Sequence, residues 1–204
     1  VLLDGVDVKE YSFDALYDRI GYVTQKAVLF AGDIRENVLF GESRGDGSEE
    51  AVGRAIELAQ AGEFVEKLEG GIHYPITQGG PNVSGGQKQR LSIARALARN
   101  PEILVFDDSF SGLDYQTDAK LRKGLSEKLQ GTTCMIVAQR IGTIRNADKI
   151  VVLDEGKAVG IGTHRPLLQS CSVYREIAQS QLSPEELRRD CGETDGSVSG
   201  KEAG

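Results

Sequence analysis

Long apolar runs are absent from this chain. A helix that crosses a membrane needs about 18 or more consecutive apolar residues, whereas the longest apolar runs here, such as residues 103–106 and 149–153, have the length of strands. We therefore expect that this segment does not itself insert into a membrane.

An initiator methionine is also lacking. The chain begins at Val1, which opens directly into an apolar, strand-like run, and no signal-peptide pattern follows. This pattern predicts a fragment whose natural N-terminus lies further upstream.

Cysteine is scarce, and a basic stripe is missing. Cys134, Cys171 and Cys191 are far apart and odd in number, so they match neither a zinc site nor a disulfide framework, and isolated thiols in a reducing compartment are expected. The net charge is −7, without a cluster of Lys and Arg. This charge pattern argues against a nucleic-acid partner.

What is present is a globular composition with an α/β pattern. The 204 residues are 39% hydrophobic and 27% charged, enough for one domain with a real core. Strand-like runs at 20–23, 103–106, 133–137 and 149–153 alternate in the second half with helical stretches at 117–129 and 143–147. This alternation predicts a mostly parallel sheet with helical crossovers.

Helical patterns also fill the region before the second strand. They start after Ser12 and Ser48, run over 34–40 and near Phe64, and resume strongly at Ser84, with a Gly- and Pro-rich loop at 69–83. A further strand is expected at 158–161 and one or two helices at 167–179. The tail 191–204 has the composition of a disordered segment.

The most informative motif is Ser84-Gly85-Gly86-Gln87 at the start of a helix. A helix N-terminus presents free backbone N–H groups and partial positive charge, and glycine lets an anion approach closely. These residues alone fit either a phosphate-binding end or a plain capped helix.

A second motif is the apolar strand at 103–106 followed by Asp107 and Asp108. An α/β sheet places carboxylates at its C-terminal edge in this way, and magnesium prefers such hard oxygen ligands. Taken alone, two acids after a strand can also simply terminate it.

Together these strings resemble the ABC ATPase family. Residues 83–97 resemble its LSGGQ signature and the helix that follows, residues 103–108 its Walker B motif, and residues 109–114 its D-loop. Gln25 falls at the Q-loop, Gln139 at the switch histidine, and residues 29–37 resemble the exporter segment that touches membrane helices. The aromatic A-loop and the phosphate loop ending in Gly-Lys-Ser/Thr would lie upstream of Val1.

The resemblance implies a RecA-like sheet with an inserted α-helical subdomain. It places the ATPase core at 1–33 and 96–190, lacking the phosphate-loop strand and helix, and the signature subdomain at 34–95. It implies ATP and Mg²⁺ as cofactors. Roles follow position by position: catalysis for Asp108, Gln139 and Gln25; magnesium for Asp107 and Gln25; nucleotide contacts for Ser84, Gly85, Gly86, Gln87 and Asp114. His164 is expected to be structural, and His73 receives no role.

The sequence departs from the family pattern at two single positions and in one three-residue string. Asp108 stands where the family has a glutamate, which withdraws the carboxylate by about 1.5 Å, and Gln139 cannot carry the positive charge of a histidine. Gln78-Gly79-Gly80 replaces the usual Glu-Arg-Gly. The pattern resembles the half of a heterodimeric multidrug exporter whose own site is weakened and whose signature completes the partner's site.

The leading interpretation is therefore the ATPase domain of an exporter that drives transport across a membrane. It implies a second ABC half, which we expect to be a different subunit, an upstream transmembrane domain of the same protein, and a position at the cytoplasmic face of the cell membrane. The fragment alone should bind ATP poorly and be inactive. Three alternatives stay open: a homodimer, a non-hydrolysing regulatory half, and a soluble ABC ATPase of DNA repair or translation.

Overall fold

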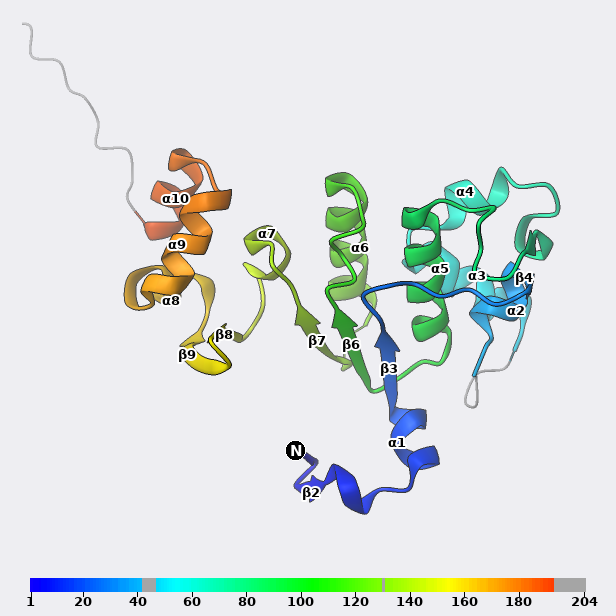
Figure 1. The fold of residues 1–204 in the computed structure, drawn as a ribbon, viewed down its shortest axis with the longest axis horizontal. Helices are drawn as coiled ribbons and strands as arrows, with labels where there is room; N and C mark the ends of the chain where they lie inside the picture. The colour runs from blue at the N-terminus through cyan, green and yellow to red at the C-terminus, as the bar shows by residue number, and fades with distance from the viewer. Residues whose placement is uncertain (42–46, 130, 193–204) are drawn as a thin grey trace, which may run out of the picture. The chain divides into compact units, whose positions relative to one another are not determined.

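The computed structural model describes residues 1–41, 47–129 and 131–192 (Figure 1). The chain divides into two compact units, Val1–Gln139 and Arg140–Gly204. Among the described residues, the helices are too short or too polar to span a membrane. The boundaries predicted for the signature subdomain, 34–95, do not coincide with this division and stay a prediction.

A three-stranded parallel sheet forms the centre of the first unit. Its strands are β3 (Ile20–Val23), β6 (Ile103–Asp107) and β7 (Thr133–Val137), in the order β3-β6-β7. Because the strands are parallel, their carboxyl ends meet at one edge, which Figure 1 shows as three arrowheads pointing the same way. The α/β fold and the parallel sheet predicted from the sequence are confirmed.

The two faces of this sheet differ in burial. One face carries the core residues Gly21, Val23, Leu104 and Phe106. A Cβ atom at Gly21 would lie 3.0 Å from the carbonyl oxygen of Ala96. Glycine at this position therefore lets the helix that contains Ala96 pack closely against β3. The opposite face carries exposed side chains, namely Tyr22, Met135 and Val137.

Helices and short strands complete the first unit. They are β1 (Leu2–Leu3), β2 (Val6–Asp7), η1 (Val8–Glu10), α1 (Phe13–Arg19), β4 (Gly32–Asp33), α2 (Ile34–Val38), α3 (Glu49–Leu58), α4 (Gly62–Glu66), η2 (Gly71–His73), β5 (Pro75–Ile76), α5 (Gly85–Ala98) and α6 (Tyr115–Lys128). Helix α5 packs against α2, α3 and β3 and supplies much of the core, including Leu91, Ile93, Ala94 and Leu97.

The Gly- and Pro-rich region at 69–83 is more ordered than expected. It contains η2 and strand β5, which pairs with β4 in antiparallel register, Ile76 opposite Gly32. The sequence signal was too weak to show this because each strand has only two residues. The predicted helix at 34–40 also ends earlier, at Val38.

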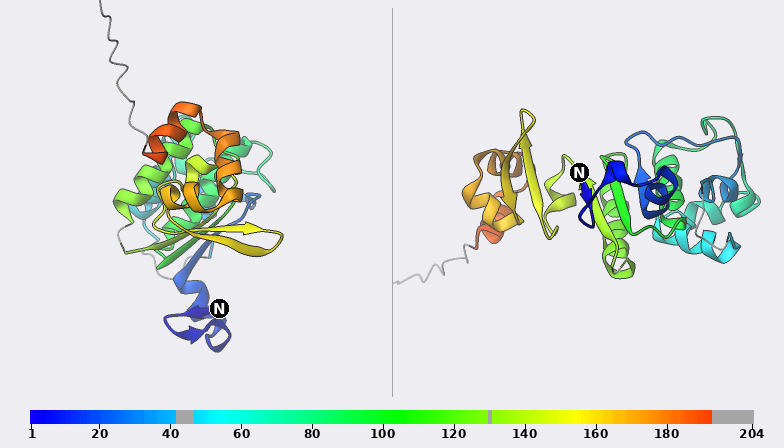
Figure 2. Two further views of the ribbon diagram at one scale, coloured as in Figure 1. Left: turned by 90° about the vertical axis from the view of Figure 1, so that its left-hand side faces the viewer. Right: turned by 90° about the horizontal axis from the view of Figure 1, so that it is seen from below.

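The second unit contains an antiparallel hairpin instead of a further parallel strand. Strand β8 (Ile150–Asp154) pairs with β9 (Lys157–Gly162), shown in yellow in Figure 2. We expected residues 149–153 to join the parallel sheet. This expectation is wrong, because the pairing described for β8 is antiparallel, with β9. The reason is the turn: Glu155 and Gly156 both adopt left-handed backbone, φ 46° and 76°, which favours a two-residue hairpin.

Four helices complete the second unit. They are α7 (Ile141–Ile144), α8 (His164–Ser170), α9 (Ser172–Gln181) and α10 (Pro184–Cys191). Of these, α8 and α9 pack on that hairpin. Helix α7 replaces the helix predicted at 143–147. Helix α10 was not predicted, although Ser183 and Glu186 form a complete capping box with Pro184 in the first turn.

The predicted disordered tail needs one correction. Cys191 is the last residue of α10, and Gly192 caps that helix with left-handed backbone, φ 81°. The rest of the predicted tail, 193–204, lies outside the described residues.

Candidate nucleotide site

Asp107 and Asp108 lie at the carboxyl edge of the parallel sheet. Asp107 is the last residue of β6, and the Asp108 amide donates a hydrogen bond to the carbonyl of Val137, the last residue of β7, at 3.0 Å. The backbone of Asp108 is left-handed, φ 46°. Aspartate tolerates that region better than longer side chains because its short carboxylate can bond locally.

The three residues predicted to be catalytic meet at a single carboxylate oxygen. The Asp108 Oδ2 atom accepts hydrogen bonds from the Gln25 Nε2 atom at 3.2 Å and from the Gln139 Nε2 atom at 3.4 Å. Gln25 follows the end of β3 and Gln139 the end of β7, so parallel strand ends bring them together. The two amides thereby hold the Asp108 Oδ2 atom from the ends of the strands on either side of β6.

The neighbouring carboxylate, Asp107, has a different partner. Its Oδ2 atom accepts a hydrogen bond from the Tyr22 hydroxyl at 2.8 Å. This hydrogen bond, aided by partial desolvation, raises the pKa of Tyr22, so the hydroxyl stays a donor. Tyr22 is 54% exposed and stands on the open face of the sheet.

The residues at this edge fit a hydrated magnesium ion. No cluster of three or more His, Cys, Asp or Glu side chains that could cage a metal occurs in the described part of the chain. Magnesium does not need such a cage, because it keeps several waters and takes one or two carboxylates together with substrate phosphates. Asp107 offers the carboxylate and the Gln25 amide a neutral oxygen.

Two further side chains fix the geometry of this edge. The buried Ser109 hydroxyl donates to the Val23 carbonyl at 2.9 Å and also contacts the Asp107 carbonyl at 3.3 Å, which joins the ends of β3 and β6. The buried Gln89 amide on α5 donates to the Thr24 carbonyl at 3.3 Å, next to Gln25. The signature helix is thereby tied to the Q-loop segment.

The signature helix begins with a capping box. The Ser84 Oγ atom accepts from the Gln87 amide at 3.3 Å, and the Gln87 Oε1 atom accepts from the Ser84 amide at 2.8 Å. The amides of Gly85 and Gly86 come next in the first turn, where a helix offers them no intrahelical acceptor. They are the groups that an external anion can use.

Neither glycine is required by the packing of this chain. A Cβ atom at Gly85 would meet nothing within 4 Å, and one at Gly86 would lie 3.7 Å from the Gly112 carbonyl oxygen, an ordinary contact. Neither residue is among the described glycines with left-handed backbone. Neither the packing of the described residues nor the backbone conformation therefore explains these two glycines.

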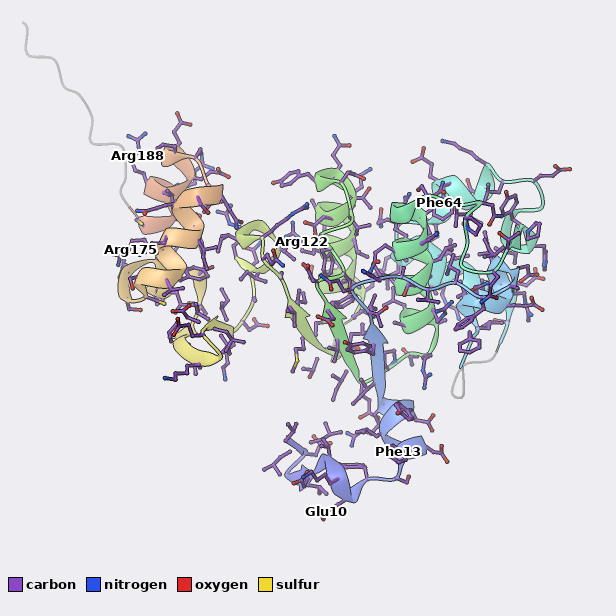
Figure 3. All side chains as sticks on the ribbon, viewed as in Figure 1. Glu10, Phe13, Phe64, Arg122, Arg175 and Arg188 are labelled. Atoms are coloured by element: carbon purple, nitrogen blue, oxygen red, sulfur yellow. The ribbon has the colours of Figure 1, made fainter. Side chains whose placement is uncertain are left out.

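Arg90 supports this helix start from one turn further along. Its guanidinium donates to the Gly86 carbonyl at 3.3 Å and to the Gln60 carbonyl at 2.8 Å, and it stacks on the Phe64 ring at 4.7 Å. Phe64 is labelled on α4 beside α5 in Figure 3. The contacts fix the orientation of the turn that holds Gly85 and Gly86.

Asp114, a predicted nucleotide contact, caps a helix in this structure. Its carboxylate accepts from the Thr117 amide at 2.9 Å and from the Thr117 hydroxyl at 2.6 Å, at the start of α6. These hydrogen bonds lower the pKa of Asp114. Any contact with nucleotide must share this carboxylate with the helix cap.

The departure at Gln78-Gly79-Gly80 has a backbone explanation. Gly79 and Gly80 both have left-handed backbone, φ 74° and 63°, and the Gly79 amide donates to the Leu29 carbonyl at 3.2 Å. An arginine at position 79 would be strained in this conformation.

His164 is embedded in the second unit. Its Nδ1 atom lies 2.8 Å from the Tyr174 hydroxyl and its Nε2 atom 2.9 Å from Asp190 Oδ2, and Arg145 donates to both oxygens of Asp190. All of these partners belong to helices α7–α10 of that unit or adjoin them, which agrees with the structural role expected for His164. His73 contacts Asp33 at 3.1 Å at the start of α2.

The sequence pattern did not single out three residues of the site: Tyr22, Ser109 and Gln89. Strand alternation could have placed Tyr22 on the same face as Asp107, because the two residues belong to adjacent parallel strands. For Gln89 and Ser109 the signal was weak, since a polar residue in a helix or a loop is usually solvated and only the fold shows these two to be buried.

Comparison with known proteins agrees with this geometry. A family model described as ABC transporter matches residues 1–111. The chain is 44% identical over 182 residues to an uncharacterized ABC transporter ATP-binding protein of Mycobacterium tuberculosis, covering 89% of this chain and 31% of that protein. It is 41% identical to an ATP-dependent lipid A-core flippase of Francisella tularensis, with 89% and 30% covered.

A solved structure is similar as well. A bacterial Atm1-family ABC exporter with ATP bound matches with a TM-score of 0.83 at 33% identity, over 88% of this chain and 31% of that one. The chain belongs to the ABC transporter family, and its fold is that of an exporter nucleotide-binding domain. It spans about a third of the length of these relatives.

Proposed function

We propose that this chain is part of the ATPase domain of an exporter, which couples ATP binding and hydrolysis to transport across a membrane. The observation that carries the proposal is the helix start at Ser84, where the Gly85 and Gly86 amides lie in the first turn and an added Cβ atom would meet nothing within 4 Å at Gly85 and the Gly112 carbonyl oxygen at 3.7 Å at Gly86. This is the geometry of an anion site, and a nucleotide phosphate is the anion it suits. Relatives with the printed names of flippase and exporter support the transport role.

Two half-sites of an ATPase are present on the first unit. The acidic edge at Asp107 and Asp108 suits magnesium and the attacking water, and the signature end suits a terminal phosphate. In the ABC family these halves act on different nucleotides, because ATP lies between two domains. We infer that the Ser84–Gln87 end completes the site of a second ABC subunit.

The chain's own site is the weaker one in this proposal. Asp108 is one methylene shorter than the glutamate it replaces, and a misplacement of about 1 Å can lower a rate on the order of a hundredfold. Both Gln25 and Gln139 donate to the same oxygen of Asp108, which weakens it as an acceptor for water. Gln139 also lacks the charge that a histidine brings to the γ-phosphate.

ATP and Mg²⁺ are the cofactors that this site calls for. Asp107, with Gln25 beside it, would hold the hydrated ion, whose charge offsets that of the phosphates. Gln25 and Gln139 would orient the water and the terminal phosphate.

The partners follow from the same reasoning. We infer a second ABC half that differs from this chain, and an upstream transmembrane domain of the same protein that receives the coupling through residues 29–37. The domain would then act at the cytoplasmic face of the membrane. An acidic chain of net charge −7 does not favour nucleic acid as a partner.

The test uses the complete transporter with both ABC halves. Replacing the partner's Walker B glutamate by glutamine should abolish most ATP turnover, whereas Asp108→Asn in this chain should change it little. If the partner substitution leaves turnover unchanged, the assignment of the competent site to the partner is wrong. Equal losses from both substitutions would instead indicate a homodimer-like pair of active sites.

A second candidate is a non-hydrolysing regulatory half. The observation in its favour is that two amides hold one oxygen, Oδ2, of the Asp108 carboxylate. Single-turnover hydrolysis separates the two proposals. A regulatory site should gain nothing from Asp108→Glu with Gln139→His, because its other groups are not arranged for catalysis.

A further inference from the structure

Tyr22 and Asp107 occupy the same open face of two paired strands. In the parallel register Tyr22 lies opposite Val105, and Asp107 is two residues further along β6, so its side chain points to the same side. The Tyr22 hydroxyl reaches along the sheet and donates to Asp107 Oδ2 at 2.8 Å. The contact joins residues that are 85 positions apart in the chain.

We propose that Tyr22 is a positioning residue for magnesium, which holds Oδ2 of Asp107 so that Oδ1 is presented to the hydration shell of the ion. The inference rests on the proposed function, since it assigns a task to Asp107 within the ATPase site. It concerns a residue outside the motifs that define that site.

The physical reason is the freedom of a carboxylate. The terminal torsion of aspartate is broad, so an Asp107 without a partner would sample many orientations of its two oxygens. A hydrogen bond from a hydroxyl to an ionised carboxylate is among the stronger ones and selects one orientation. The Tyr22 hydroxyl, 2.8 Å from Asp107 Oδ2, is placed to be that donor.

The placement of Tyr22 separates this role from a structural one. The side chain is 54% exposed, whereas its neighbours Gly21 and Val23 on the other face belong to the buried side of the sheet. Removing one exposed hydroxyl leaves that buried face untouched. The effect of Tyr22→Phe should therefore appear in metal binding and not in the folding of the chain.

The test is a manganese titration of the full-length transporter assembled with its partner and loaded with a non-hydrolysable ATP analogue. Free Mn²⁺ is read by electron paramagnetic resonance, and nucleotide binding is measured separately in EDTA. For Tyr22→Phe we expect Mn²⁺ affinity at this site to fall about two- to tenfold, the range for one net hydrogen bond. Nucleotide binding without metal should be unchanged.

Tyr17→Phe is the matched control. Tyr17 is 60% exposed and stacks on Phe13. It lies on α1, which precedes the amino end of β3, whereas the acidic edge lies at the carboxyl ends of the strands. The substitution should leave Mn²⁺ affinity at the parent value. Thermal unfolding of both variants checks that they fold like the parent.

Excess metal provides a second readout. A positioning defect raises the metal concentration needed for half-maximal turnover of the chain's own site, measured with the partner's site inactivated, and leaves the maximal rate intact. Equal Mn²⁺ affinity in Tyr22→Phe and parent overturns the inference, as does a lower maximal rate without a shift in metal dependence. If the parent itself binds neither nucleotide nor Mn²⁺, the proposed function fails instead.

Discussion

The signature end (Ser84–Gln87) and the acidic edge (Asp107 and Asp108) of the first unit differ in one respect. They differ in how far the chain itself supplies hydrogen-bond partners for their polar groups. At the acidic edge, Tyr22 holds Asp107, and Gln25 and Gln139 hold Asp108. At the signature end, the capping box pairs Ser84 with Gln87, and no intrahelical acceptor exists for the Gly85 and Gly86 amides in the first turn.

This difference indicates where an external ligand is needed. A backbone N–H group gains most from a partner that the chain does not supply, while a carboxylate held by several donors is already stabilised. We therefore propose that the signature end takes a phosphate and that the acidic edge takes a metal ion. The following predictions test that contrast, beginning with the largest effect.

Replacing Gly85 by valine should reduce ATP turnover of the complete transporter on the order of a hundredfold, the loss typical of one preorganised donor group. The added side chain would fill the space through which the phosphate approaches. Gly53→Val on α3 is the matched control, because a Cβ atom at Gly53 also meets nothing within 4 Å. If Gly85→Val and Gly53→Val reduce turnover to a similar extent, Gly85 has no special role in binding a phosphate.

Restoring the usual residues at the acidic edge should raise hydrolysis by the chain's own site. With the partner's site inactivated, we expect Asp108→Glu together with Gln139→His to increase single-turnover hydrolysis about tenfold or more. Each single substitution should give much less than half of the gain in free energy, because the two side chains share one hydrogen bond. Additive effects would contradict the coupling seen in the structure.

Ser84→Ala should lower the free energy of unfolding by about 1 kcal/mol through loss of the helix cap, and should also reduce turnover. Ser183→Ala removes an equivalent capping box from α10, so we expect a similar local loss of stability there with turnover preserved. Denaturant unfolding and ATPase assays distinguish the outcomes. If Ser183→Ala impairs turnover equally, the effect at Ser84 is a matter of stability alone.

The smallest effect concerns pH and the second unit. Burial raises the pKa of Asp190, but the hydrogen bond with His164 and the charge of Arg145 outweigh it and hold the pKa below its ordinary value. The stabilisation is complete above the ordinary aspartate pKa of about 4 and is lost as the pH falls through the lower folded value. Urea midpoints should therefore fall on acidification in the parent, and less steeply in Asp190→Asn.

Much of the fold could be predicted because its signals are local. Ser12, Ser48 and Ser84 each cap a helix at the residue expected, and the strand at Ile20–Val23 has the predicted limits. The errors arose in strand pairing, where one local turn signal was overlooked and two strands are too short to show a pattern. The hairpin of β8 and β9 is set by turn residues Glu155 and Gly156, and the two-residue strands β4 and β5 have no periodicity to detect.

The residues of the candidate site that lie in sequence motifs could be predicted, whereas the contacts that hold them in place could not. Parallel strands bring Gln25, Asp108 and Gln139 to one edge, as their positions after strands imply. The Tyr22–Asp107 hydrogen bond and the buried Ser109 hydroxyl depend on register and on packing across the sheet. Residue types alone do not carry that information.

The most direct measurement is the structure of the complete transporter trapped with ATP and its partner subunit. The account predicts that the Gly85 and Gly86 amides lie about 3 Å from oxygens of a terminal phosphate whose phosphate loop belongs to the partner. A helix start turned away from every phosphate, or bound to a nucleotide held by this chain's own phosphate loop, would contradict it.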